Sequence, residues 1–244
     1  MYFVMAAQGM YRQLTLVMSL ALVLGGLVVA QGNQKLLGAA MASQVETLFG
    51  EKGKQALLQW AQFVVNQGDE YQVDKERQTL DQINRFFNKR MAFVSDKQHW
   101  QQEDYWATPL ESLTTQAGDC EDYVIAKYFS LIQAGVEQQK LRITYVKALK
   151  LNQAHMVLAY YATPKSDPLI LDNINPNILP ASKRRDLAPV YSFNGMGMWI
   201  ERQQGGSIKV GSPNRLSRWM DVLLRMQQQG LQPWLDLPVS QLTQ

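Results

Sequence analysis

The spacing of apolar residues changes once along this chain, and that change constrains the fold more than any other feature. Before Gly135 the apolar side chains recur every three or four positions, as in Leu57, Trp60 and Val64. After Lys140 they alternate with polar ones. The first spacing gathers apolar groups on one face of a helix, and the second gathers them on one face of a strand. Helices followed by an antiparallel meander indicate an α+β fold.

The same spacings predict the individual elements. Amphipathic helices are expected at Val45–Asn66 and Asp74–Arg90. A third helix is expected at Asp119–Ala134, because Gly118 precedes it and Gly135 can end it. Six strands are then expected at Leu141–Leu149, His155–Ala162, Leu169–Asn173, Val190–Phe193, Met196–Arg202 and Ser207–Val210. A closing helix is expected at about Asn214 to Gln229.

The connections have their own signals. Asn194-Gly195 and Gly205-Gly206 are typical of two-residue hairpin turns. The aromatic-rich stretch from Val94 to Ala117 is expected to be a loop. Since no repeat or long linker divides the chain, residues 31–244 are predicted to form one domain.

Composition excludes several classes of protein. With 46% hydrophobic residues in 244, the chain can bury a sizeable core, so disorder is not expected. The net charge is +3, and without the first 30 residues it is 3 − 1 = +2, because Arg12 is the one charged residue there. That balance gives no reason to expect a nucleic-acid partner.

The N-terminus predicts export. Arg12 precedes an uncharged apolar run, Leu14–Ala30, which ends in small residues. This pattern is typical of a secretory signal peptide, here residues 1–30. The alternative is an uncleaved membrane anchor, since 17 residues reach the short limit of a spanning helix. Both alternatives carry the remaining chain across a membrane, and we expect the periplasm.

Cys120 is the one cysteine of the chain, so it cannot form an internal disulfide. It could be buried filler, a link to another chain or a reactive thiol. Its predicted place in the first turn of a helix favours the thiolate, because the positive end of the helix dipole lowers a thiol's pKa.

A reactive thiol needs a base, and the chain has two histidines, His99 and His155. His155 opens a predicted strand, and Asp172 ends the next one. A tight reversal near Thr163-Pro164 would place them opposite each other. A looser turn centred near Ser166 would place Asp172 opposite Ala159 instead, roughly 13 Å along the strand from His155. The simpler alternative is that His155 is a buried core residue whose ring nitrogens are hydrogen-bonded and take no part in catalysis.

Four local motifs together resemble the bacterial transglutaminase-like cysteine proteinases. They are Trp106-Ala107-Thr108-Pro109, Gly118-Asp119-Cys120-Glu121-Asp122-Tyr123, Gln153-Ala154-His155-Met156-Val157-Leu158 and Leu171-Asp172-Asn173. The resemblance implies a papain-related α+β core with the cysteine-bearing helix packed on an antiparallel sheet. It also implies Cys120 as nucleophile, His155 as general base and acid, and Asp172 as the residue that orients the imidazole.

The oxyanion of such a reaction needs hydrogen-bond donors. The resemblance implies the backbone N–H of Cys120 as one donor. An indole N–H is a second candidate, and the sequence leaves Trp100 and Trp106 as alternatives.

Carboxylates on both sides of the cysteine oppose its ionisation. Asp119, Glu121 and Asp122 place negative charges beside a group that must also become negative, and like charges raise a thiol's pKa. Capping of the helix accounts for one or two of them. A bound cation with oxygen ligands would remove the conflict, and the resemblance implies Ca²⁺ held by these three acids.

The resemblance further implies a periplasmic endopeptidase that cuts the N-terminal region of a large surface adhesin at paired alanines. Release of the adhesin would promote biofilm dispersal, and an inner-membrane receptor for cyclic di-GMP would sequester the protease. Two alternatives are a transglutaminase or amidase that uses the same acyl chemistry, and a periplasmic binding module that does not catalyse.

Overall fold

The computed structural model describes residues 42–64, 66–67, 75–202 and 206–231. It divides the chain into two compact units, residues 1–43 and 44–244, and the second unit is described below. The predicted signal peptide, residues 1–30, lies outside the described residues. Within the described ranges, no helix is both long and apolar enough to cross a membrane.

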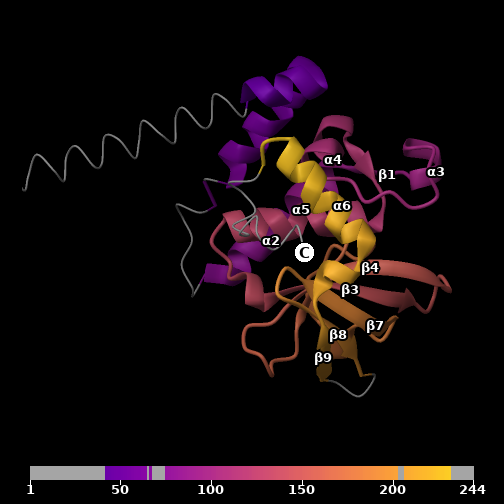
Figure 1. The fold of residues 1–244 in the computed structure, drawn as a ribbon. Coiled ribbons are helices and arrows are strands. Elements are labelled where there is room, and N and C mark those ends of the chain that lie inside the picture. The colour runs from indigo at the N-terminus through magenta and orange to yellow at the C-terminus, as the bar shows by residue number, and fades with distance from the viewer. Residues whose placement is uncertain (1–41, 65, 68–74, 203–205, 232–244) are drawn as a thin grey trace, which may run out of the picture. The chain divides into compact units, whose positions relative to one another are not determined.

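A seven-stranded antiparallel sheet forms the second half of the unit (Figure 1). Its spatial order is β6-β5-β4-β3-β7-β8-β9. The strands are β3 (Leu141–Ala148), β4 (Gln153–Tyr160), β5 (Leu169–Leu171), β6 (Leu179–Pro180), β7 (Leu187–Asn194), β8 (Gly197–Glu201) and β9 (Ser207–Gly211). The six predicted strands are therefore present. The sequence did not predict β6, because a two-residue strand is too short to show an alternating pattern.

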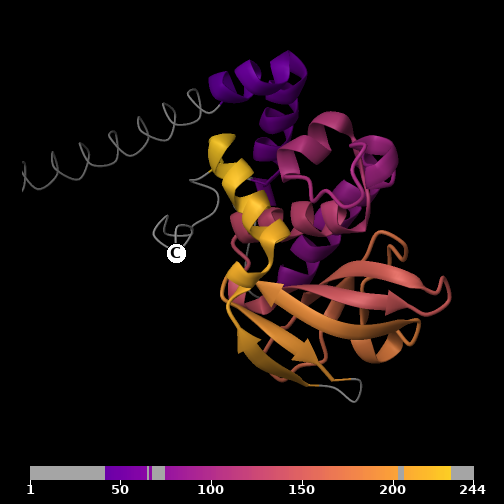
Figure 2. The same cartoon turned by 45° about the vertical axis from the view of Figure 1, so that its right-hand side comes forward.

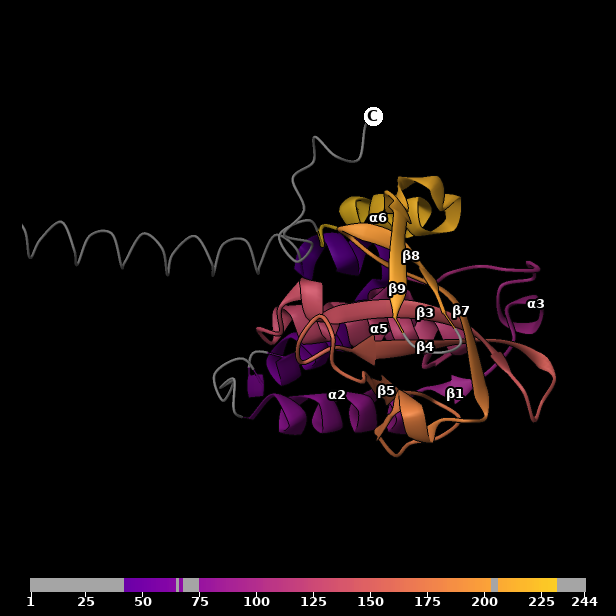
Figure 3. The ribbon, with the colours of Figure 1, turned by 90° about the horizontal axis from the view of Figure 1, so that it is seen from below.

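Helices cover one face of this sheet (Figure 2). The central one is α5 (Cys120–Gln133), which packs against β3, β4 and α2 (Glu76–Arg90). Figure 3 places α2 and α6 (Ser217–Gln228) on opposite sides of α5. Residues 44–64 are also helical. The helices-then-strands order confirms the predicted α+β class.

The ends of α5 and α6 follow from local chemistry. The side chain of Asp122 accepts a hydrogen bond from the backbone N–H of Asp119 at 3.2 Å, which ties the first turn of α5 together. Gly135 and Gly230 follow the two helices with φ of 99° and 76°, a left-handed conformation that favours glycine. Cys120 is accordingly the first residue of α5.

The prediction that Val94 to Ala117 form a loop is wrong in part. This stretch contains α3 (Asp96–His99) and α4 (Pro109–Thr115). A short parallel pair, β1 (Ala92–Phe93) with β2 (Ala117–Gly118), encloses these helices.

The start of α4 had a signal in the sequence. Thr108 and Glu111 form a reciprocal capping box, and Pro109 takes the first helical position. The Thr108-Pro109-Leu110-Glu111 pattern therefore marked a helix start.

Two turn predictions also need correction. Asn194 pairs with Gly197, so the β7–β8 turn consists of Gly195 and Met196, one residue later than predicted. Asn194 instead accepts a hydrogen bond from the Met196 backbone N–H at 2.8 Å. Glu201 pairs with Ser207, so the β8–β9 connection spans residues 202–206 and is no two-residue turn. Part of it, Gly205 included, lies outside the described residues.

Candidate active site

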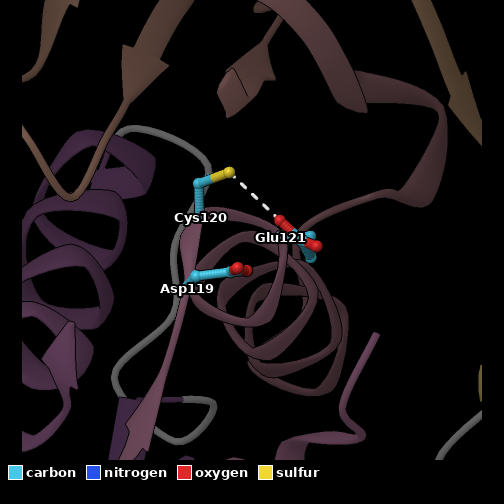
Figure 4. A group of neighbouring side chains, drawn as sticks. All are labelled: Asp119, Cys120 and Glu121. Carbon is cyan, nitrogen blue, oxygen red and sulfur yellow. Dashed lines mark hydrogen bonds between the residues drawn. The ribbon is translucent and has the colours of Figure 1, made fainter. Parts of the chain in front are cut away.

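The cysteine thiol lies at the N-terminus of α5 and is partly buried. Its hydrogen bond goes to Glu121, whose Oε2 lies 3.1 Å from Sγ (Figure 4). The backbone N–H of Met156 also donates to the sulfur. Because Met156 follows His155 on β4, the helix start and the histidine strand meet at this point.

His155 and Asp172 are in direct contact. The imidazole Nε2 lies 2.8 Å from Asp172 Oδ1, and both side chains are buried. Leu171 pairs with Leu158, so Asp172 reaches the sheet near Val157. The register therefore falls between the two alternatives that the sequence left open. Since Nε2 binds the carboxylate, Nδ1 is the nitrogen available to a thiol.

Asp172 has a second strong partner that the sequence did not reveal. Arg184 donates from Nη2 to Asp172 Oδ2 at 2.7 Å, and both side chains are buried. The Ile174 backbone N–H donates to Oδ1 at 3.0 Å. Burial disfavours the charged carboxylate, but the hydrogen bonds from His155 and Arg184 outweigh burial and lower the pKa of Asp172 to about 2.

Arg184 itself is held from two sides. Its Nε and Nη2 also donate to Asp186 at 3.0 and 2.8 Å. It lies just after a short 3-10 turn, Ala181–Lys183, in a connection between strands. Nothing in the run Lys183-Arg184-Arg185 distinguished the middle residue before the fold placed it behind Asp172.

Lys127, seven residues after Cys120 on α5, is a second buried cation near Asp172. Its Nζ has no hydrogen-bond partner among the described residues. Burial lowers the pKa of Lys127 to about 7, and the negative charge of Asp172 opposes this shift.

Five carboxylates gather around the start of α5. Asp119, Glu121 and Asp122 come from the predicted set, and the fold adds Asp96 and Asp104. Two groups of three acids within this acidic cluster, Asp96–Asp104–Glu121 and Asp96–Asp119–Asp122, bring ligand atoms within 4.8 Å of one another. The two added residues lie in the region read as a loop, where spacing alone gave no reason to join them to Cys120.

The acidic cluster is not neutralised from within. Burial and neighbouring carboxylates raise the pKa of Asp96 to about 6 and of Glu121 to about 9. Burial likewise raises the pKa of Asp122, and burial together with the charge of Glu121 raises that of Cys120. The cluster and a thiolate can therefore not all be ionised without added positive charge.

The residues present fit a calcium ion. Asp96 Oδ1 and Asp119 Oδ1 are buried and have no hydrogen-bond partner among the described residues, so two acceptor oxygens are available. Clustered carboxylate oxygens are the ligands that Ca²⁺ prefers. Asp122 is less available, because its two oxygens accept from the backbone N–H groups of Ala107 and Asp119 at 2.7 and 3.2 Å. Asp96, Asp119 and Glu121 are therefore the better candidate ligands. Asp104 forms a group with Asp96 and Glu121, but its two oxygens already contact Trp106 Nε1 and Arg218 Nη2, each at 2.9 Å.

The two candidate indole donors differ. Trp106 Nε1 donates to Asp104 Oδ1 at 2.9 Å, and its ring stacks on Phe193. Trp100 Nε1 is buried without a partner among the described residues, and its ring contacts His99 and Tyr105. The structure thus commits the Trp106 donor to the acidic cluster. An indole donor to the oxyanion stays a prediction.

Comparison with known proteins identifies the family. The model of the bacterial transglutaminase-like cysteine proteinase family, BTLCP, matches residues 61–192, a range that contains Cys120, His155 and Asp172. Two structures of Legionella pneumophila LapG, one of them EGTA-treated, share 36% sequence identity with a TM-score of 0.65. Each match covers 78% of this chain and 97% of that chain.

A calcium-bound structure of Legionella pneumophila LapG shares 37% identity with a TM-score of 0.62, covering 76% of this chain and 98% of that one. No curated protein sequence matches the chain. The similarity to LapG confirms the predicted transglutaminase-like core. Because the family model covers more than half of the sequence and the LapG structures are matched over nearly their whole length, this chain belongs to the bacterial transglutaminase-like cysteine proteinases.

Proposed function

We propose that this cysteine proteinase is a calcium-dependent endopeptidase with Cys120, His155 and Asp172 as its catalytic triad. The observation that carries the proposal is the meeting of two elements. The 2.8 Å His155–Asp172 contact joins β4 to the residue that follows β5, and the next residue of β4, Met156, donates its backbone N–H to the Cys120 sulfur at the start of α5.

The chemistry follows from this arrangement. Cys120 Sγ passes its proton to His155 Nδ1 and attacks the carbonyl carbon of a peptide bond, while Asp172 holds the imidazole from the other side. The imidazolium then gives its proton to the departing amine. A water molecule, deprotonated by His155, cleaves the resulting thioester and restores the thiol. The Cys120 backbone N–H stabilises the oxyanion in both steps.

The acidic cluster supplies the calcium dependence in this proposal. Asp96, Asp119 and Glu121 would hold the ion. When bound, Ca²⁺ adds positive charge beside Cys120 and so favours the thiolate that the bare carboxylates oppose. The predicted ligand Asp122 contributes mainly by anchoring the loop at Ala107.

The substrate and setting of the proposal rest on the family resemblance that the sequence motifs carry. We propose export to the periplasm and cleavage of the N-terminal region of a large surface adhesin at paired alanines. Cleavage would release the adhesin and promote biofilm dispersal. An inner-membrane receptor for cyclic di-GMP would withhold the protease while that nucleotide is abundant.

The deciding experiment incubates the purified protein with the N-terminal region of an adhesin from the same organism. Three conditions are compared: added calcium, excess EGTA, and EGTA followed by calcium in excess. We expect one defined cut with calcium, none with EGTA, and recovery after calcium is restored. Cys120→Ser is the control for a contaminating protease.

Two outcomes would contradict the proposal. An intact adhesin fragment in the presence of calcium would reject the proposed substrate. Incorporation of an added primary amine, in place of hydrolysis, would instead identify a transglutaminase.

A further inference from the structure

Four apolar side chains form a row across neighbouring strands of the sheet. Tyr145 on β3 pairs with Tyr191 on β7, Tyr191 pairs with Ile200 on β8, and Ile200 pairs with Ile208 on β9. The two tyrosine rings stack with centroids 5.2 Å apart. Ile200 and Ile208 are 51% and 47% exposed. These four residues are called the cross-strand row below.

The cross-strand row continues from the reaction centre. On its inner side Tyr145 pairs with Met156, whose backbone N–H donates to the Cys120 sulfur. Burial raises the pKa of Tyr191, and the negative charges of Asp104 and Glu121 raise it further. Tyr191 therefore lies within electrostatic range of the acidic cluster.

Packing of the core does not require the outer part of this row. Phe193, two residues along β7 on the same face, is buried beneath the rings of Trp106 and Trp219. The row lies one step further along the strands, and its outer two members are exposed.

The other face of these strands has a polar cover of its own. Trp199 carries Arg142 and Lys209 over its ring. A strand face turned to solvent normally carries polar residues, and exposed aliphatic side chains are normally scattered. Two exposed isoleucines in register, joined through two tyrosines to β4, therefore indicate a surface that binds something apolar.

We propose that the cross-strand row binds an extended segment of the substrate polypeptide that carries apolar side chains on one side of the cut bond. The inference rests on the proposed proteolysis. Neighbouring strands are ~4.8 Å apart, so Ile200 and Ile208 lie roughly 14 and 19 Å from β4. An extended peptide advances ~3.3 Å per residue, which places these contacts about four to six residues from the scissile bond.

A peptide library prepared by digesting a bacterial proteome tests the row without a known substrate. The calcium-loaded protein is incubated with the library, and the new ends are identified by mass spectrometry. We expect apolar residues to be enriched about four to six positions from the cut, on one side. Ile200→Ser and Ile208→Ser should abolish that enrichment and lower kcat/KM for a preferred peptide roughly tenfold.

Leu224→Ser is the matched control. Leu224 is 43% exposed on α6, outside the row, so the same loss of an exposed aliphatic side chain should change neither the preference nor kcat/KM. Thermal unfolding of each variant checks that the fold is retained.

The remaining outcomes separate the row from the proposed function. Cleavage without positional preference, or with a preference that the two isoleucine variants leave intact, overturns the row and leaves the proteolysis standing. Cleavage of the adhesin fragment without cleavage of any peptide shows recognition of a folded shape, and it overturns the row as well. If neither the adhesin fragment nor any peptide is cut, the proposed proteolysis and the proposed role of the cross-strand row are both rejected.

Discussion

Two groups of acids lie beside the proposed reaction centre, and they differ in how their charge is balanced. Asp172 has His155 on one oxygen and Arg184 on the other, at 2.8 and 2.7 Å. In the part of the chain that the structure describes, the acidic cluster at the start of α5 has five carboxylates. Of these, Asp104 pairs with Arg218 at 2.9 Å, whereas Asp96 and Asp119 have buried oxygens without partners there. Correspondingly, the pKa of Asp172 is lowered to about 2, whereas that of Glu121 is raised to about 9.

In the proposed function, this difference separates the site into a part whose charge the chain balances itself and a part whose charge calcium would balance. Buried charges are stable in proteins when they are paired or bind a metal. Asp172, beside His155, is paired with Arg184 and so meets the first condition. The nucleophile side can satisfy the second through calcium. Four predictions test this division, beginning with the largest expected effect.

The largest effect is expected from the reacting groups themselves. Cys120→Ser and His155→Ala should each reduce cleavage of the adhesin fragment at least about a thousandfold, because members of a catalytic triad act as a unit. Asp172→Asn should retain the most native shape, since it keeps the side-chain volume. Rates are measured with calcium present, and circular dichroism monitors the fold. A wild-type rate for Cys120→Ser would end the triad assignment, and a wild-type rate for His155→Ala would leave His99 as the remaining histidine.

Removal of Arg184 should cost the most stability. Arg184→Met removes the cation that is hydrogen-bonded to the buried Asp172, and breaking a buried pair on one side typically costs about 3–5 kcal/mol. Asp186→Asn is the control, because Arg184 then keeps its bond to Asp172 and loses a partner at a more exposed site. Urea denaturation measures both variants. Equal losses would mean that Arg184 stabilises the connection between strands and does not specifically balance Asp172.

Calcium should act on the acidic cluster alone. At a hundredfold excess over its dissociation constant, calcium should stabilise the wild type by about 2.7 kcal/mol, and the double variant Asp119→Asn, Glu121→Gln should gain almost nothing. In EGTA the order should reverse, with the double variant more stable than the wild type. The wild type must either keep repelling carboxylates or bind a proton at Glu121, whose pKa is raised to about 9, and the double variant does neither. Asp186→Asn removes an acid outside the cluster and should keep the calcium gain. Differential scanning calorimetry distinguishes these cases, and a double variant that binds calcium as the wild type does would reject these ligands.

The fourth prediction is a slope of stability with pH in the calcium-free protein. Folding raises the pKa of Asp96 from 3.8 to about 6 and that of Glu121 from 4.5 to about 9. The folded state therefore holds more protons in this window, and the unfolding free energy falls as pH rises through it. Asp172 gives a slope of the opposite sign. Its contribution to stability is present above pH 3.8 and is lost as the pH falls towards about 2.

Calcium-free protein should therefore melt at a higher temperature at pH 5 than at pH 8, and bound calcium should reduce this difference. Melting curves at both pH values, with and without calcium, measure the effect. The same slope in both states would show that the cluster does not control it.

Local signals predicted most of the fold. The alternation after Lys140 was sufficient for the strands of the meander, and Gly135 and Gly230 marked the ends of two helices. The errors lie where one residue pair decides a turn or a helix start. Asn194 caps the β7–β8 turn from outside it, and Thr108 with Glu111 begins a helix in a stretch whose aromatic content suggested a loop.

The site divides in a similar way. By itself the sequence determined the chemical types: one cysteine at a helix start, a histidine and an aspartate on successive strands, and acids beside the cysteine. Their motifs carried the family resemblance that the comparisons confirm.

Tertiary structure alone decided the partners: Arg184 behind Asp172, Asp96 and Asp104 beside Glu121, and a row of four side chains from four strands. The physical reason is that propensity and periodicity act over a few neighbouring residues. Arg184 meets Asp172 twelve residues away, and Asp96 meets Glu121 although α4 and β2 lie between them in the sequence. Such contacts form when the sheet register and the packing of α5 bring distant segments together, and the energy of burying a charge depends on which segments those are.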